Sequence, residues 1–158
     1  MIAPPNSARD REPQMNCKIA TVEELGIRPL QHYSAENGDL LVAEGGREVP
    51  FSIARVFTVR AELGAVRGEH AHKGCAQFLI AVNGAVDVLC DDGAAKRTFR
   101  LDRVDVGLLL PPSIWATQTF LAPHSVLLVL CDQLFQESDY IRAYEPFLEW
   151  RKARGERS

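Results

Sequence analysis

Hydrophobic and polar positions alternate along most of the chain, in short runs separated by turn residues. Alternation with a period of two is typical of half-buried β-strands. Turn signals such as Asn83-Gly84 and Asp91-Asp92-Gly93 divide the runs from one another. We therefore expect strands over Cys17–Ala20, Gly38–Ala43, Phe51–Val59, Glu69–Lys73, Gln77–Leu89, Lys96–Leu101, Val106–Leu110, Trp115–Phe120 and Ser125–Cys131.

Helical periodicity is nearly absent before Ser138. This serine can cap a short helix that runs through Tyr144, with Tyr140 and Tyr144 on one face. Many short, evenly spaced strands indicate a closed or two-sheet β architecture rather than a parallel α/β sheet. We predict an all-β protein with one domain over residues 17–150, a leader at 1–16 and a charged, frayed tail at 151–158.

Composition narrows the classes of function. The 158 residues suit a single core, and 18 Lys and Arg against 21 Asp and Glu give a net charge of −3. This balance argues against a protein that binds nucleic acid. The longest apolar runs fall far short of the roughly 18 residues of a membrane span, and the leader has no signal-peptide core. We expect no membrane partner and a cytoplasmic location.

The four cysteines form no CxxC pair. In a chain without a signal peptide, cysteines are expected to be free and buried. Cys75 differs from the others in its context, because two histidines precede it closely.

The block Arg67-Gly68-Glu69-His70-Ala71-His72-Lys73 carries the candidate chemistry. In a strand, His70 and His72 face the same side, while Ala71 points away and is small enough to pack under a second sheet. Two imidazoles on one inner face can bind a metal or transfer protons. Arg67 is planar and permanently charged, which suits it to anchor a phosphate.

The spacing around this block resembles the two signature motifs of the cupin superfamily. The matching positions are Gly64, His70, His72, Gln77 and Gly84, followed by Gly107, Pro111, Ser113 and Ala116. The resemblance implies a cupin-type jelly-roll β-barrel. Gln77 stands where metal-binding cupins have Glu, and Ala116 stands where they have a third His, so we expect no metal and no cofactor. Cys75 could add a ligand, but the turn after Lys73 is expected to carry it away from the strand face.

A narrower resemblance rests on four features of the sequence. They are the block 67–73, Gln77, the two turns Asn83-Gly84 and Asp91-Asp92-Gly93, and the segment Ser138-Asp139-Tyr140-Ile141-Arg142-x-Tyr144. Over residues 17–150 the chain is similar to the dTDP-sugar 3,4-ketoisomerases, the WxcM-like isomerases of deoxysugar biosynthesis. This implies a homodimer with exchanged N-terminal strands. It also implies conversion of dTDP-4-keto-6-deoxyglucose to its 3-keto isomer, which a PLP-dependent aminotransferase then aminates.

The resemblance also implies roles for individual residues. His72 would be the base and His70 its partner in proton transfer, and Arg67 would bind the pyrophosphate. Gln77 and Trp115 would line the sugar pocket.

Further substrate contacts are expected at Thr58, Arg55 and Lys73. The family commonly has a tyrosine in the strand where this chain has Phe57 and Thr58, so Thr58 or a water would donate the proton. The charge of Lys73 would keep His72 neutral. Three alternatives stay open: a related epimerase, a metal-dependent cupin, and a non-catalytic cupin that binds a nucleotide sugar.

Overall fold

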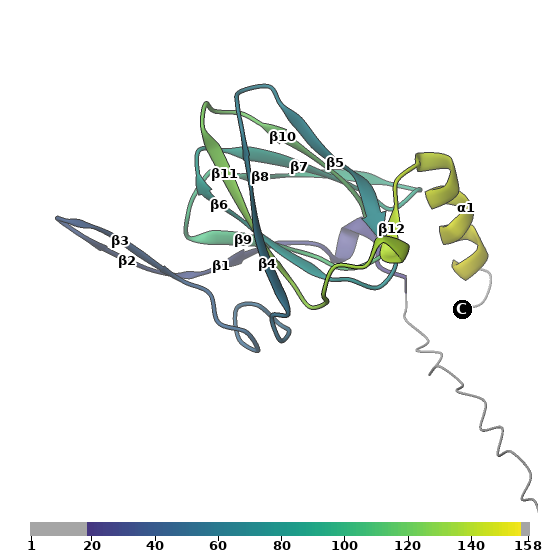
Figure 1. The fold of residues 1–158 in the computed structure, drawn as a ribbon, viewed down its shortest axis with the longest axis horizontal. Helices are drawn as coiled ribbons and strands as arrows, with labels where there is room; N and C mark the ends of the chain where they lie inside the picture. Colours follow the sequence, from purple (N-terminus) through teal and green to yellow (C-terminus); the bar gives the residue numbers. More distant parts are fainter. Residues whose placement is uncertain (1–18, 156–158) are drawn as a thin grey trace, which may run out of the picture.

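Two five-stranded antiparallel sheets face each other in the computed structural model, which describes residues 19–155 (Figure 1). The first sheet has the order β1 (Ile27–Pro29), β9 (Val106–Leu110), β6 (Gln77–Asn83), β11 (Ser125–Cys131) and β4 (Arg55–Ala61). The second has the order β12 (Tyr140–Ile141), β5 (Val66–His72), β10 (Trp115–Phe120), β7 (Val86–Asp91) and β8 (Lys96–Leu101). The sheets form an open sandwich compatible with a jelly roll, so the predicted fold class is confirmed.

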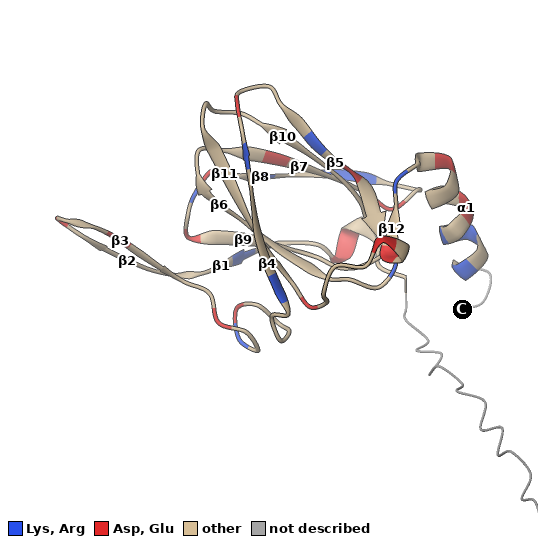
Figure 2. Cartoon of the chain, in the orientation of Figure 1, with Lys and Arg blue, Asp and Glu red and all other residues tan. Residues whose placement is uncertain are grey.

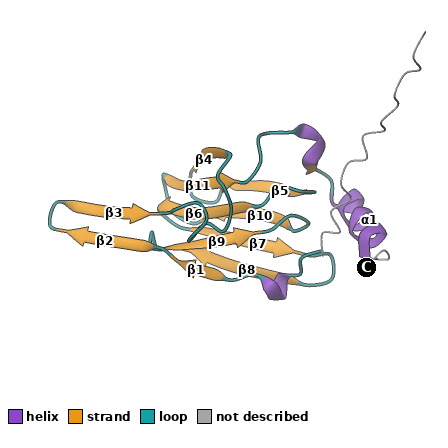
Figure 3. Cartoon of the chain, turned by 90° about the horizontal axis from the view of Figure 1, so that it is seen from below, coloured by secondary structure: helices purple, strands orange, loops and turns teal. Residues whose placement is uncertain are grey.

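The remaining elements lie outside the two sheets. Strands β2 (Gln31–Ala35) and β3 (Gly38–Val42) pair only with each other, in a hairpin that extends beyond the sandwich (Figure 3). The helix α1 (Tyr144–Gly155) lies at the opposite end. Two short 3-10 helices, η1 (Val22–Glu24) and η2 (Glu137–Asp139), connect the other elements. Within the described residues, no helix is long and apolar enough to cross a membrane.

Four expected strands are confirmed at their predicted bounds, namely β8, β9, β10 and β11. Others have shifted bounds. The expected strand Gln77–Leu89 is two strands, β6 and β7, because Gly84 turns the chain with a φ of 73° and a Cβ there would collide with Ser125. The strand expected over Phe51–Val59 begins at Arg55. The strand expected over Cys17–Ala20 lies partly outside the described residues, and its described residues are irregular.

The C-terminal helix does not lie where the sequence pattern placed it. The segment expected to be a helix from Ser138 to Tyr144 contains η2 and the strand β12, and α1 begins at Tyr144. The reason is tertiary, because Tyr140 and Ile141 extend the second sheet by pairing with His72 and Ala71. The expected frayed tail is helical through Gly155.

The main core fills the space between the two sheets, with Leu79, Leu108 and Leu127 of the first sheet and Phe120 of the second all fully buried. A separate cluster lies on the outer face of the second sheet. There Ala71, Ile141 and Phe147 are buried, with Trp115 and Tyr144 packed against them. Ala71 therefore packs under helix α1 and not, as expected, under a second sheet.

Candidate active site

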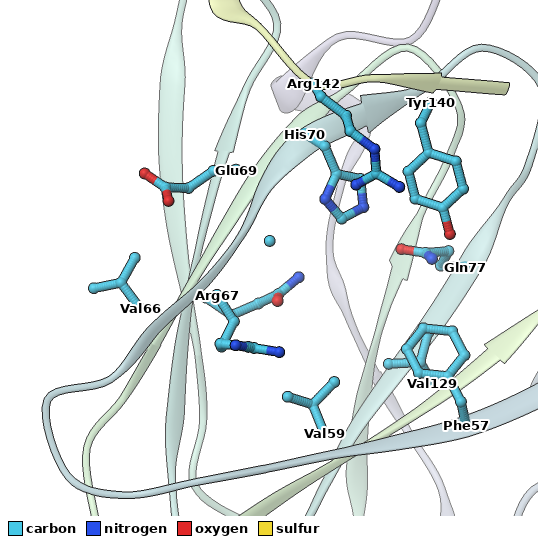
Figure 4. A pocket seen from close by; sticks show the side chains of 12 residues that line it. Phe57, Val59, Val66, Arg67, Glu69, His70, Gln77, Val129, Tyr140 and Arg142 are labelled. Carbon is cyan, nitrogen blue, oxygen red and sulfur yellow. The ribbon is translucent and has the colours of Figure 1, made fainter. Parts of the chain in front are cut away.

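A β-bulge in strand β5 brings the candidate residues to one side. The pairing of β5 with β10 shifts register so that Glu69 is an extra residue between Gly68 and His70. Residues three apart on a regular strand face opposite sides, but the extra residue re-aims the chain. Arg67 and His70 consequently line the same cavity (Figure 4). Gly68 has a φ of 83°, and a Cβ there would lie 2.8 Å from the Ala116 carbonyl oxygen, so only glycine fits.

This cavity has a volume of about 400 Å³ and lies where β5 meets the strands of the first sheet. Its apolar part is formed by Phe57, Val59 and Val129. Its polar part is formed by Arg67, His70, Gln77, Gln118, Tyr140 and Arg142. The Tyr140 hydroxyl points toward Gln77 (Figure 4). Such a mixture of apolar surface and a few convergent polar groups is typical of a small-molecule site.

His72 is held from both sides and is only 4% exposed. Its Nδ1 lies 2.7 Å from Asp139 Oδ2, and its Nε2 lies 3.2 Å from Gln77 Nε2. A carboxylate only accepts hydrogen bonds, so Nδ1 carries the proton and Nε2 accepts from the Gln77 amide. Asp139 is itself fixed, because the Gly74 backbone N–H donates to its Oδ1 at 2.7 Å. The tautomer of His72 is therefore set by its neighbours.

Both histidines form one aromatic group with Tyr140. The rings of His70 and His72 lie 5.0 Å apart, and that of Tyr140 lies 4.3 Å from His72. Burial lowers the pKa of both imidazoles; the charge of Arg142 lowers that of His70 further, and the Asp139 contact opposes the shift for His72. Both rings are thus neutral near pH 7.

Lys73 plays no part in this effect, contrary to expectation. Its ammonium group donates to the Ser138 carbonyl oxygen at 2.6 Å, on the exposed side of the chain.

The structure sorts the remaining expected site residues. Gln77 and Arg67 line the cavity with His70. Arg55 lies at its edge, with its guanidinium 5.4 Å from the centre of the Phe57 ring. Thr58 is exposed, because β4 alternates and turns Phe57 inward, so the expected proton donor is on the wrong face. Trp115 is also outside the cavity.

The Trp115 side chain lies on the face of strand β10 that is turned away from the cavity. Its ring packs on Tyr144 and Phe147 at centroid distances of 5.4 and 5.6 Å, beneath helix α1. Strand alternation instead directs Ala116 toward the histidines, where it lines a small cavity with them.

Four site residues were not assigned a role from the sequence: Gln118, Asp139, Tyr140 and Arg142. The last three belong to the segment from Ser138 to Tyr144, which the sequence pattern predicted to be a helix. Gln118 follows Ala116 by two positions on β10, so alternation along that strand was a usable signal.

Cys75 lies beside the histidines, where the turn was expected to carry it away. It lines the small cavity with His70 and His72, and its thiol donates to the Ala76 carbonyl oxygen at 3.4 Å. The neighbouring Cys75 thiol and the Arg55 guanidinium, whose Nη2 is 3.5 Å from the Cys131 sulfur, lower the pKa of Cys131. Cys75, Cys90 and Cys131 are all buried and free.

A jelly-roll sandwich with paired imidazoles beside a cavity defines a cupin-like protein of the sugar-isomerase type. Residues 20–152 match the FdtA family model, described as WxcM-like, C-terminal. The chain belongs to this family, and the resemblance deduced from its motifs is confirmed.

Individual relatives agree with this assignment. The chain is 36% identical over 114 residues to the TDP-4-oxo-6-deoxy-alpha-D-glucose-3,4-oxoisomerase of Aneurinibacillus thermoaerophilus, covering 72% of this chain and 82% of the relative. The structure of QdtA, a sugar 3,4-ketoisomerase from Thermoanaerobacterium thermosaccharolyticum in complex with TDP, superposes with a TM-score of 0.80 at 29% identity, over 85% and 98% of the two chains. The WlaRB TDP-quinovose 3,4-ketoisomerase of Campylobacter jejuni gives 0.75 at 32%, over 81% and 99%.

The contact between His72 and Asp139 leads to a testable prediction about the pKa of His72. Because Asp139 raises the pKa of His72 against the effect of burial, Asp139→Asn is expected to lower that pKa further. An NMR titration of the imidazole protons measures the shift. Asp102→Asn, which removes an exposed carboxylate just after the end of strand β8, should leave it unchanged. An unchanged or raised pKa of His72 in Asp139→Asn would contradict this account.

Proposed function

We propose that the protein is a sugar-nucleotide 3,4-ketoisomerase that acts on a dTDP-linked 4-keto-6-deoxyhexose. The observation that carries the proposal is the pair of neutral, adjacent imidazoles, one backed by a carboxylate, in a chain of this family. Relatives named as 3,4-oxoisomerase and 3,4-ketoisomerase support the same activity.

The reaction requires two proton transfers and a change of carbonyl position. The C4 carbonyl acidifies the hydrogen on C3, so a base removes it and an enediolate forms with its charge on the C4 oxygen. The O3 proton then moves to O4 as C4 receives a proton, which gives the 3-keto isomer with a hydroxyl on C4. Acid and base groups with a pKa near neutral pH suit both transfers.

His72 is the proposed base. Asp139 keeps the proton on Nδ1 and stabilises the imidazolium that forms when Nε2 accepts the C3 proton, as the carboxylate does in a Ser-His-Asp triad. The Gln77 amide occupies Nε2 in the substrate-free chain, and its rotation toward the sugar frees the lone pair. His70 lines the larger cavity and is the proposed donor of the proton to C4, with the His72 imidazolium formed in the first step as the source of the replacement proton.

Tyr140 is the proposed donor to the sugar oxygens, in place of the tyrosine that the family commonly has at the Phe57 strand. Its ring lies tilted against both imidazoles, and its hydroxyl faces the cavity (Figure 4). A phenol can hydrogen-bond to the oxygen that becomes charged in the enediolate, which stabilises the intermediate. Phe57 supplies apolar surface only.

Arginines on the strands around the cavity are the proposed diphosphate site. Basic residues occur on both β4 and β5 (Figure 2). Among the described residues, no side chain pairs with the Arg67 guanidinium, which lies across the cavity. A planar guanidinium without an internal partner is suited to bind phosphate oxygens through two parallel hydrogen bonds.

The projecting hairpin is the proposed means of dimerisation, by exchange of N-terminal strands. All residues of β2 are exposed, and Tyr33 and Leu40 are each 58% exposed on apolar side chains that a partner sheet could cover. The buried, free thiols suit the reducing cytoplasm. The product is a 3-keto sugar, so a PLP-dependent aminotransferase is the proposed next enzyme. The proposed reaction uses no metal or cofactor.

The separate roles proposed for His72, as the base, and His70, as the proton donor to C4, can be tested in deuterated water. His72→Asn should lower kcat by at least about 100-fold and abolish exchange at C3, because the base is lost. His70→Asn should lower turnover but retain C3 exchange, because only delivery to C4 fails. NMR of the sugar after incubation with dTDP-4-keto-6-deoxyglucose measures both. Exposed His124→Asn is the control, and C3 exchange at the wild-type rate in His72→Asn would place the base elsewhere.

The role of Arg67 separates binding from chemistry. Arg67→Ala should raise KM for the nucleotide sugar with little change in kcat, because the contact is the same in ground state and transition state. The matched control is Arg60→Ala, an exposed arginine that points outward from β4. Steady-state kinetics decide the question. A fall in kcat at unchanged KM would exclude the anchoring role.

Assembly is tested through the hairpin. Tyr33→Ser combined with Leu40→Ser should weaken the dimer, because both side chains are exposed in the single chain and are expected to be covered by the partner. Deletion of residues 1–14 should leave the dimer intact. Analytical ultracentrifugation measures both. A monomeric wild-type protein, or a double variant that dimerises as tightly as wild type, would refute strand exchange.

A further inference from the structure

Behind the paired imidazoles, three side chains of types that bind metals meet at one point. One ring nitrogen of His72, the Cys75 sulfur and a carboxylate oxygen of Asp139 all lie within 4.8 Å of one another. Two of these residues, Cys75 and Asp139, lie at none of the positions where the cupin motifs hold a metal.

We propose that His72, Cys75 and Asp139, with water as the fourth ligand, form a site for one soft divalent cation such as Zn²⁺, and that its occupation inhibits the enzyme. The inhibition, but not the binding, rests on the proposed function. Zinc takes nitrogen, thiolate and carboxylate ligands in a tetrahedron with bonds of about 2.0–2.3 Å. Such bonds place ligand atoms about 3.3–3.8 Å apart. His72 Nδ1 and Asp139 Oδ2, which lie 2.7 Å apart, would have to separate slightly, and the other separations, all within 4.8 Å, would have to change by no more than about 1 Å.

The charges around the cluster suit a bound cation. One thiolate, one carboxylate and a divalent cation sum to zero, so the occupied site adds no net charge to the buried cluster. Metal binding would release the Cys75 thiol proton to solvent, since the thiol must ionise to become a ligand, and the proton on the coordinating nitrogen of His72 would leave or move to the other ring nitrogen.

Binding and catalysis compete for the same atoms. The metal would take the nitrogen of His72 and the carboxylate of Asp139, whose mutual hydrogen bond makes His72 a base with a defined tautomer. Cys75 shares a small cavity with both imidazoles, so the ligands of this site adjoin the catalytic pair.

A cobalt titration of the metal-free, full-length protein tests the site directly. One equivalent of Co²⁺ should produce thiolate-to-cobalt charge-transfer bands together with the visible bands of tetrahedral cobalt, and Zn²⁺ should remove them. Cys75→Ser should weaken cobalt binding by more than about 100-fold, since loss of a direct ligand exceeds the usual effect of an outer contact. Cys90→Ser is the matched control, because Cys90 is equally buried but belongs to no group of potential metal ligands among the described residues.

Enzyme assays complete the test. Stoichiometric Zn²⁺ should inhibit isomerisation by wild type and Cys90→Ser, while Cys75→Ser should resist inhibition. The absence of charge-transfer bands, or equal cobalt affinity in Cys75→Ser and wild type, would overturn the site. A metal-free protein that binds cobalt as expected but has no isomerase activity would instead overturn the proposed function and leave the metal site standing.

Discussion

The site depends on the pairing of two residues, Tyr140 and Ile141, with the edge of strand β5. This pairing places Asp139 against His72 and the Tyr140 ring over both imidazoles. It is held from the outer face, where Ile141 and Ala71 pack against Phe147 of helix α1. A two-residue strand contributes little by itself, so burial of this apolar cluster maintains the pairing. The basicity of His72 is therefore linked to the packing of the C-terminal helix on the opposite face of the sheet.

A second constraint is the bulge, which changes which residues share a face. Regular alternation on β5 would turn Arg67 away from the side that carries His70 and His72. The extra residue Glu69 places Arg67 on the side that carries His70, and both line the larger cavity. On strand β4 regular alternation divides neighbours into inner and outer residues, as with Phe57 and Thr58. The proposed phosphate anchor Arg67 and His70 can thus line one cavity because strand β5 is irregular at this point.

The local sequence pattern was sufficient to predict those strands whose ends are set by neighbouring turn residues. Strands β8 to β11 are short runs between turn residues, and their bounds follow from the sequence. The histidine block likewise singled out Arg67, His70 and Gln77, which line one cavity, and His72, which lies beside them. Errors arose where distant contacts decide the outcome. Tyr140 and Ile141 have the spacing of a helix but pair with residues almost seventy positions earlier, and that pairing is also what recruits Asp139. No local signal distinguishes Trp115, which the helix covers, from a pocket residue.

The same arrangement would allow the proposed proton transfer and the proposed metal binding to share one place. A general base needs a neutral imidazole whose second nitrogen is held by a carboxylate, and the proposed zinc site would use the same two groups. A cation there would displace the proton on the coordinating nitrogen of His72 and the proton on the Cys75 thiol. Whether the proposed site holds protons or a metal therefore depends on the competition between protons and cations. Burial favours the proton-bound form, because it disfavours an ionised Cys75 thiol until a cation is present to balance it.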